Sequence, residues 1–407
     1  MGRIYFDNSA TTRTDNEVME AMLPFMREHY GNPSSLHSFG KEARRALNES
    51  REKVAALIAA EPSEIIFTSG GTESNNLAIK GFAMVNRKKG KHIITSSIEH
   101  HAVFSPCEYL EKNGFEVTTI PVDQDGIVDI AAFESAIRED TVLVSIMNAN
   151  NEIGTIQPID RIAEIATSKG IAFHTDAVQA AGHIPINVKK ENIAMLSLSA
   201  HKFYGPKGIG ALYIERGVRL EPLLHGGGHE RGMRSSTENV PGIVGIGKAA
   251  ERAKENMAEE SKRLTRLRDM IIDSVLKKVP RSYLNGHRRK RLPNNAHLRF
   301  DFIEGESLIL YLDMKGFAVS TGSACSTKSL EPSHVLLAIG LRPEQAHGSL
   351  RLTLGKDNTE EEVKQFIDIL PDVVAKLREM SPYNENNPMN PKEPWCDTEN
   401  HRVRGDE

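Results

Sequence analysis

The segment 60–215 alternates between short runs of β-branched residues and longer stretches in which apolar residues recur at three- and four-residue steps. The runs predict strands at 64–68, 92–95, 116–120, 141–146, 171–174 and 195–198. The stretches between them predict helices, for example at 76–88 and 159–168. Strands that alternate with helices are typical of an α/β fold with a largely parallel sheet.

The pattern changes after three consecutive glycines at 226–228. A long charged helix is predicted over 243–279, followed by a mixed α+β segment. The predicted units are an N-terminal segment that packs on the small domain (1–14), a large domain (15–260), a small domain (261–380) and a tail (381–407). The last unit holds four prolines and five asparagines without an apolar period, which predicts disorder.

Composition narrows the class of protein. The 407 residues include 51 basic and 55 acidic side chains, so the formal net charge is −4. This balance excludes attraction to nucleic acid or to anionic membranes as a main driving force. No apolar run approaches the ~20 residues that span a bilayer, and Asp7 comes too early for a signal peptide. We expect a cytoplasmic protein without a membrane or direct nucleic-acid partner, and we interpret the basic run 288–291 as a solvated loop.

The three cysteines are Cys107, Cys325 and Cys396. Their odd number and wide spacing argue against a disulfide framework and against a zinc cluster, so no metal site is predicted. Cys325 lies among small polar residues, which predicts an exposed loop, and Lys328 would favour its thiolate. The alternative is a buried packing residue, which is our interpretation of Cys107.

Three further motifs lie at predicted strand ends. Thr-Ser-Gly-Gly-Thr-Glu at 68–73 joins a strand to a helix, where free backbone N–H groups favour a phosphate, although plain turn chemistry is the alternative. Asp176 ends a strand and could hold a ring nitrogen protonated or cap a helix. Lys202 follows a buried strand, where desolvation would free its amine for a Schiff base, although most lysines lie at the surface. Together these parts are what a pyridoxal phosphate site requires.

Six ordered motifs resemble the cysteine desulfurases of the NifS/IscS type, in the class V aminotransferase group of fold-type I pyridoxal phosphate enzymes. They are Tyr-Phe-Asp-Asn-Ser-Ala-Thr-Thr at 5–12, Gly-Asn-Pro-Ser-Ser at 31–35, Thr-Ser-Gly-Gly-Thr-Glu-Ser-Asn-Asn at 68–76, Asn-Asn-Glu-Ile-Gly at 150–154, Ser-Ala-His-Lys at 199–202 and Gly-Ser-Ala-Cys at 322–325. The likeness runs from about residue 4 to about residue 380. It implies a large domain with a mostly parallel sheet that binds the cofactor, and a small α+β domain that carries the cysteine loop.

The resemblance also implies roles for single residues. Lys202 would hold the cofactor and act as the base, Asp176 would pair with its ring nitrogen, and His100 would stack on the ring and move protons. The remaining cofactor contacts would come from Gly71, Thr72, Ser199 and His201 at the phosphate, Gln179 at the ring hydroxyl and Asn151 beside the ring. Arg351, Asn151 and Asn32 would bind the substrate. Thr237 would reach the phosphate of a neighbouring subunit, which implies a homodimer.

The implied reaction converts L-cysteine to L-alanine and leaves a persulfide on Cys325, which then passes sulfur to an acceptor such as an iron–sulfur scaffold protein. Cys325 would also be a transient ligand of an iron–sulfur cluster. Two alternatives stay open at this point. One is a selenocysteine lyase or another class V enzyme, and the other is a catalytically silent scaffold that binds sulfur acceptors.

Overall fold

The larger part of the protein is built on a seven-stranded sheet. The computed structural model describes residues 3–322 and 332–383. The strands are β2 (Ile65–Thr68), β3 (His92–Ser96), β4 (Glu116–Ile120), β5 (Thr141–Ser145), β6 (Ala172–Asp176), β7 (Met195–Ser199) and β8 (Gly210–Ile214), in the spatial order β2-β8-β7-β6-β5-β3-β4. Only β8 runs antiparallel to its neighbours in this sheet. The expected α/β fold with a mostly parallel sheet is confirmed.

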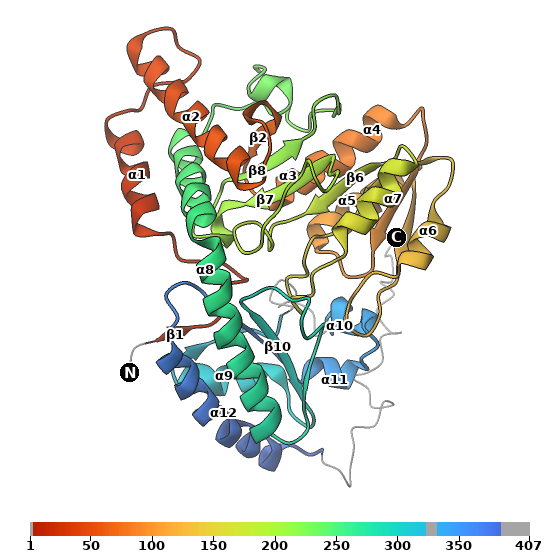
Figure 1. Ribbon diagram of the computed structural model, residues 1–407, viewed down its shortest axis with the longest axis vertical. Helices are drawn as coiled ribbons and strands as arrows, with labels where there is room; N and C mark the ends of the chain where they lie inside the picture. Colours follow the sequence, from red (N-terminus) through yellow and green to blue (C-terminus); the bar gives the residue numbers. More distant parts are fainter. Residues whose placement is uncertain (1–2, 323–331, 384–407) are drawn as a thin grey trace, which may run out of the picture.

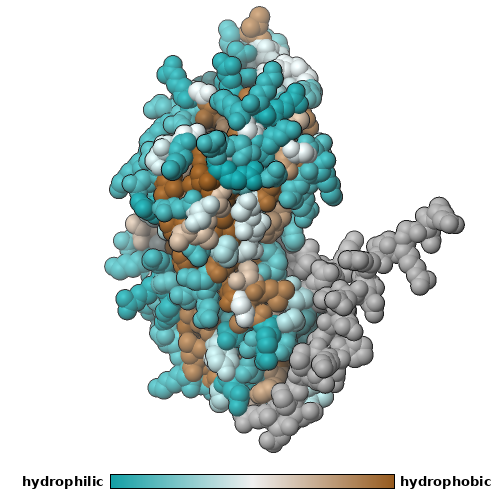
Figure 2. Space-filling model, turned by 90° about the vertical axis from the view of Figure 1, so that its right-hand side faces the viewer, coloured by the Kyte–Doolittle hydropathy of each residue, from teal (hydrophilic) through white to brown (hydrophobic). Residues whose placement is uncertain are grey.

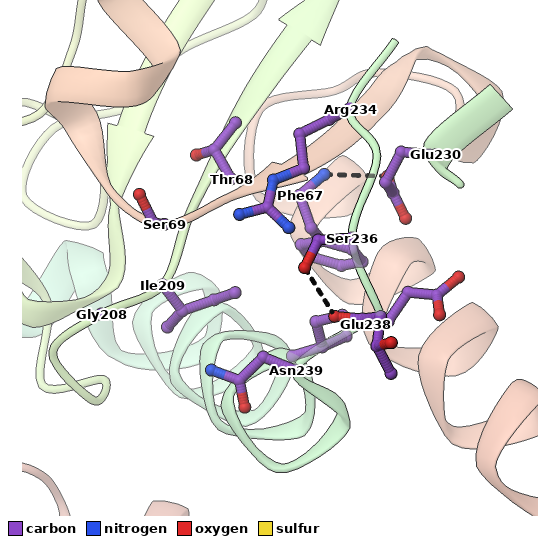
Figure 3. Close-up of a pocket in the computed structure, with 12 residues that line it drawn as sticks. Phe67, Thr68, Ser69, Gly208, Ile209, Glu230, Arg234, Ser236, Glu238 and Asn239 are labelled. Carbon is purple, nitrogen blue, oxygen red and sulfur yellow. Dashed lines mark hydrogen bonds between the residues drawn. The ribbon is translucent and has the colours of Figure 1, made fainter. Parts of the chain in front are cut away.

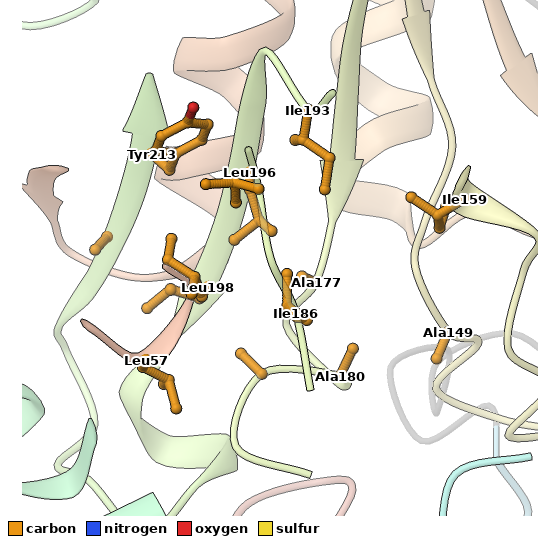
Figure 4. Close-up of a cluster of buried hydrophobic side chains, with 14 of the residues drawn as sticks. Leu57, Ala149, Ile159, Ala177, Ala180, Ile186, Ile193, Leu196, Leu198 and Tyr213 are labelled. Carbon is orange, nitrogen blue, oxygen red and sulfur yellow. The ribbon is translucent and has the colours of Figure 1, made fainter. Parts of the chain in front are cut away.

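Helices cover both faces of this sheet (Figure 1). They are α1 (Asn16–Arg27), α2 (Ser38–Leu57), α3 (Gly71–Asn76), α4 (Phe82–Asn86), α5 (His101–Lys112), α6 (Ile130–Ala136) and α7 (Ile159–Ser168). Successive side chains of a strand point to opposite faces, so the sheet separates two apolar clusters. In β8, Tyr213 joins the cluster drawn in Figure 4, while Leu212 joins the cluster under α3, α4 and α5.

A single long helix, α8 (Val240–Lys278), runs through both halves of the molecule (Figure 1). Its residues Ile243 to Ala250 pack into the first cluster, whereas Leu264 to Val275 pack into a second core. We keep residue 260 as the proposed domain boundary, because the partners of the helix change between these two stretches.

The second core belongs to a smaller α+β region. Its antiparallel sheet has the order β12-β10-β9, from β9 (Ser282–Leu284), β10 (Asn295–Phe300) and β12 (Ser349–Thr353). Its helices are α9 (Gly305–Met314), α10 (His334–Ala338), α11 (Pro343–His347) and α12 (Glu360–Met380). Near the N-terminus, β1 (Ile4–Tyr5) pairs in parallel with β11 (Phe317–Ala318), and Phe6 enters the second core.

Most predicted elements are confirmed, with three differences. The helix predicted at 76–88 begins earlier, at Gly71, and contains one π-helical turn at Leu77–Gly81. The strand β8 was not predicted, because its five residues are all buried and lack alternation. The basic run is not simply solvated, since Arg291 is 3% exposed and Arg288 pairs with Asp269 and Asp273.

The surface agrees with the modest charge and hydropathy of the sequence. Hydrophilic side chains cover most of the face in Figure 2, and hydrophobic side chains gather in groups along its middle. Within residues 3–322 and 332–383, we find no helix that combines the length and the apolar character needed to cross a bilayer.

Candidate active site

The predicted site residues gather where the parallel strands end. Asp176 is the last residue of β6, and Ser199 is the last residue of β7. The short helix Ala200–Lys202 follows β7 directly, and Gly71 lies three residues beyond the end of β2. In open α/β sheets, ligands bind beyond these carboxyl ends, so the topology itself brings distant motifs together.

The Lys202 ammonium is directed at the N-terminal segment. Its Nζ donates hydrogen bonds to the carbonyl oxygens of Ser9 at 2.5 Å and Ala10 at 2.8 Å. The Gln179 side chain donates to the same Ser9 oxygen at 3.0 Å. Lys202 is partly buried, and the hydroxyl of Ser9 is a buried polar atom without a hydrogen-bond partner. The segment that follows β1 therefore forms one wall beside the lysine.

Asp176 is a buried carboxylate held by two donors. Asn75 in α3 donates to its Oδ2 at 2.6 Å, and the backbone N–H of Val178 donates to its Oδ1 at 2.9 Å. No helix is present between Asp176 and Met195, all of which the structure describes, so the helix-capping alternative is wrong. Each carboxylate oxygen of Asp176 therefore has one hydrogen-bond donor.

His100 immediately precedes α5, and one hydrogen bond shows which of its ring nitrogens carries the proton. Its Nδ1 accepts a hydrogen bond from the backbone N–H of Ala102 at 3.0 Å, so the neutral ring carries its proton on Nε2. Burial lowers the pKa of His100; Asp176 acts to raise it and Lys202 to lower it further. A neutral imidazole with a free N–H on one side is suited to stack on an aromatic ring and to pass a proton.

The turn between β2 and α3 approaches the end of β7 closely. Gly70 has a φ of +156°, and a methyl group added at Gly71 would lie 2.7 Å from Val178 Cγ2 and 3.7 Å from Ser199 Cβ. Thr72 is exposed beside them. The His201 ring lies 3.2 Å from the Thr11 hydroxyl, and burial lowers the pKa of His201 to about 4. Gly71, Ser199 and His201 thus lie at neighbouring strand ends, where small side chains and backbone N–H groups suit a phosphate.

The loop that carries Thr237 packs against the turn between β2 and α3. Figure 3 shows the Arg234 guanidinium between Phe67 and the Thr68–Ser69 turn. Arg234 pairs with Glu73 at 2.9 Å, and Glu73 also accepts from the backbone N–H of Ser69 at 2.8 Å. Thr237 itself is exposed and lines a cavity of about 190 Å³ with these residues.

A buried ion pair makes a second attachment of the same loop. Arg51 in α2 donates to both oxygens of Glu230, at 2.7 Å and 2.6 Å. Glu230 also accepts from the backbone N–H of Phe67 in β2 at 2.9 Å. Two carboxylates thus tie the loop to β2 and to the start of α3.

Arg351 lies in β12 of the smaller region and faces the strand ends. It is 3% exposed and pairs with Asp7 through Nη2 at 2.9 Å. Its Nη1 donates to the carbonyl oxygens of Asn151 at 3.1 Å and Gly322 at 3.2 Å, whereas its Nε has no partner. Arg351 and Asn151 are thus brought together, as the resemblance implies.

Three predicted residues are not among the group at the carboxyl ends of β6 and β7 that the structure describes. Asn32 is exposed between α1 and α2, where its side-chain oxygen accepts from the backbone N–H of Ser34 at 2.8 Å. Thr237 is exposed on its loop and lines the cavity beside Thr68 and Ser69. Cys325 lies outside the described residues, as does the tail from residue 384.

Sequence reasoning missed polar residues that support the site. Asn75 holds Asp176, and its position four residues after Gly71 on the same helix could have indicated this. Glu99 is fully buried beside His100; its Oε1 accepts from the Ser96 hydroxyl at 2.6 Å and from the Met147 backbone N–H at 2.9 Å. Burial raises the pKa of Glu99 to about 8. Its adjacency to His100 was the only sequence signal.

Comparisons with known proteins agree with this geometry. The family model described as Aminotransferase class-V matches residues 4–366. The chain is 59% identical over 379 residues to a protein of Methanosarcina thermophila named cysteine desulfurase IscS. The alignment covers 93% of this chain and 94% of that relative.

Solved structures give the same result. One described as a NifS-like protein matches with a TM-score of 0.87 and 43% identity, covering 92% of this chain and 100% of the other. Another, described as SspA in complex with cysteine, matches with a TM-score of 0.77 and 39% identity, covering 86% of this chain and 98% of the other. The chain therefore belongs to the class V aminotransferase family and, within it, to the cysteine desulfurases of the NifS/IscS type.

Proposed function

We propose that this protein is a pyridoxal phosphate-dependent cysteine desulfurase, which converts L-cysteine to L-alanine and transfers the sulfur to Cys325. The observation that carries the proposal is the grouping of Lys202, Asp176 and His100 at one edge of the sheet, where the pKa of His100 responds to both of the other residues. The family membership supports the same reaction.

The residues at the strand ends fit pyridoxal phosphate. A methyl group at Gly71 would lie 2.7 Å from Val178 Cγ2, so this position has no space for a side chain, and a glycine here suits the close approach of a phosphate to the backbone. Lys202 would hold the aldehyde carbon and Asp176 would face the ring nitrogen. The other cofactor contacts would come from Thr72, His100, Asn151, Gln179, Ser199 and His201. When bound, the cofactor supplies a ring that withdraws electrons from Cα of the substrate.

Each protein group then has a defined task. Asp176 would meet the ring nitrogen with a carboxylate whose two oxygens are held by Asn75 and Val178. The Lys202 amine would take the proton from Cα of the substrate and return one to the product. His100, neutral and protonated on Nε2, would hold that proton ready beside the cofactor.

The sulfur step belongs to Cys325. Its thiolate attacks the sulfur of L-cysteine, so a sulfur–sulfur bond forms as the carbon–sulfur bond of the substrate breaks. The bonding electron pair stays with the carbon skeleton, which gains a proton and leaves as L-alanine. Cys325 is left as a persulfide, which an acceptor protein, such as an iron–sulfur scaffold, takes over.

The substrate carboxylate would bind Arg351, with Asn151 alongside. The Nε of Arg351 is buried without a partner, and its Nη2 is held by Asp7. The edge formed by these two nitrogens matches a carboxylate in a bidentate pair. We propose that the substrate takes this edge over from Asp7, while Asn32 is a weaker candidate for the same group.

A homodimer is part of the proposal. Apolar side chains are exposed on and between α1 and α2, including Met26 at 58%, Tyr30 at 74% and Leu36 at 82%. Exposed apolar patches of this kind mark interaction surfaces. Thr237 is also exposed, so it is free to reach the phosphate of a second copy.

The test is incubation of the reconstituted protein with L-cysteine and a reductant. We expect alanine and sulfide in equal amounts, and an absorbance band near ~420 nm from the lysine-bound cofactor. Lys202→Ala should lose the band and lower alanine formation at least ~10³-fold. A protein that shows neither band nor product would be a scaffold, and turnover of selenocysteine alone would identify a lyase.

A further inference from the structure

Glu152 contacts one of the two chain ends that flank residues 323–331. The Ser333 hydroxyl donates to Glu152 Oε2 at 2.5 Å, and the same hydroxyl accepts from the Leu336 backbone N–H at the start of α10. Glu152 and Ser333 are 5% and 7% exposed. The contact is therefore a buried, charge-assisted hydrogen bond, which is among the stronger kinds.

The same carboxylate lies against the other chain end. Gly322 has a φ of +99°, and a methyl group added there would lie 3.3 Å from Glu152 Oε2 and 3.1 Å from His297 Nε2. The Gly322 carbonyl accepts from Arg351, and its N–H donates to the Ser320 hydroxyl at 3.2 Å. Any side chain at position 322 would press on the Glu152 carboxylate.

Glu152 is itself held rigidly. Its backbone N–H donates to Asn150 Oδ1 at 2.9 Å, and its carbonyl accepts from Asn295 Nδ2 at 2.9 Å. It directly follows Asn151, whose carbonyl accepts from Arg351. The carboxylate is thus fixed to the same segment that meets the proposed substrate-binding arginine.

We propose that Glu152 is a positioning residue for the sulfur step, because it holds Ser333 next to Gly322, and these two residues flank Cys325 in the sequence. This inference rests on the proposed function. With Ser333 held there, both flanking residues stay next to the proposed substrate-binding arginine, which raises the effective concentration of the thiol at the site. Glu152 acts through Ser333 and does not need to touch the substrate.

The test separates the two halves of the reaction. The first half is followed by the change in cofactor absorbance on addition of L-cysteine, and the second by the persulfide on Cys325 in a single turnover. In Glu152→Ala we expect the first rate within about 3-fold of the natural protein and the second lowered about 10- to 100-fold. Glu152→Gln keeps an acceptor for Ser333 and should restore most of the second rate.

Two further variants complete the design. Ser333→Ala should lower the persulfide rate several-fold, whereas Glu139→Ala, at an exposed position, should change neither rate. An unchanged persulfide rate in Glu152→Ala, or an equal loss in both halves, would overturn the proposal.

Hydrogen exchange keeps this test separate from the proposed function. If the natural protein forms no persulfide, the proposed function fails, and amide exchange in the cofactor-free protein still decides the anchoring. Faster exchange across 332–341 in Glu152→Ala than in Glu139→Ala supports the anchor. Equal exchange in the two variants contradicts it.

Discussion

The ends of the parallel strands and the second core are both buried, but they differ in whether their buried atoms have interaction partners. In the second core, Phe6, Phe317 and Phe366 contact one another with ring centroids 5.4 to 5.9 Å apart. Around the strand ends, several buried polar atoms have no hydrogen-bond partner, namely Ser9 Oγ, Asn75 Oδ1, Glu99 Oε2, Asn148 Oδ1, Thr175 Oγ1 and Arg351 Nε.

An unmatched buried polar atom costs stability, and proteins keep such atoms mainly where a ligand or a reaction uses them. The apolar core of the smaller region contributes stability without offering chemistry. Stability and function are therefore assigned to different sets of side chains: the phenylalanine cluster supports the fold, whereas the polar residues at the strand ends, together with Arg351 from the smaller region, are kept ready for a ligand.

Phe366→Ala tests the stability side and has the largest expected effect. The ring is fully buried, so its removal leaves a cavity and should lower the free energy of unfolding by about 3–5 kcal/mol. Activity per folded molecule should stay within about 2-fold, since the ring lies outside the site. Urea unfolding measures the stability, and active-site titration measures the activity per folded molecule. A loss of activity without a loss of stability would show that Phe366 serves the site and not only the apolar core.

Asp176→Asn tests the chemical side. The amide keeps the size of the side chain and one acceptor, but it removes the carboxylate that, in the proposed function, would keep the ring nitrogen protonated. We expect kcat/KM to fall about 10²- to 10³-fold, comparable to about 3–4 kcal/mol of transition-state stabilisation. Unfolding should change by no more than about 1 kcal/mol. A large loss of stability with unchanged kcat/KM would assign Asp176 to the fold instead.

Glu99→Gln gives the smallest effect and depends on pH. Burial raises the pKa of Glu99 from its ordinary 4.5 to about 8, so the folded protein retains a proton that the unfolded chain releases. Through this group, the free energy of unfolding falls as the pH rises from about 5 to about 8. The variant lacks this loss, so its free energy of unfolding should rise relative to that of the natural protein as the pH increases from about 5 to about 8.

The measurement for Glu99 is urea unfolding of both proteins without cofactor at several pH values. A difference between them that stays constant from pH 5 to 8 would show that Glu99 is not held protonated.

Local pattern predicted the elements well where periodicity was strong. The helix α7 has the predicted bounds 159–168, and α8 differs from its predicted range by only a few residues. The strand β8 was missed because a short strand that is buried on both faces has no alternation to detect. Its antiparallel pairing with β2 and β7 depends on contacts distant in sequence.

The site residues also divide into those that the sequence predicts and those that it does not. Asp176 and Lys202 could be predicted because each follows a strand, and strand ends meet at one edge. Glu99 and Glu152 could not, because their roles depend on hydrogen bonds to residues far along the chain. Arg291 was misjudged for the same reason, since its carbonyl acceptor in Ile153 is 138 positions away.

The central claim is that sulfur from L-cysteine passes to Cys325. The most direct measurement is the mass of the peptide that contains Cys325, after the reconstituted protein has reacted with L-cysteine and been digested without reductant. We predict a gain of one sulfur atom on Cys325, none on the buried Cys107, and none in Lys202→Ala. Alanine formation with an unmodified Cys325 peptide would contradict the account.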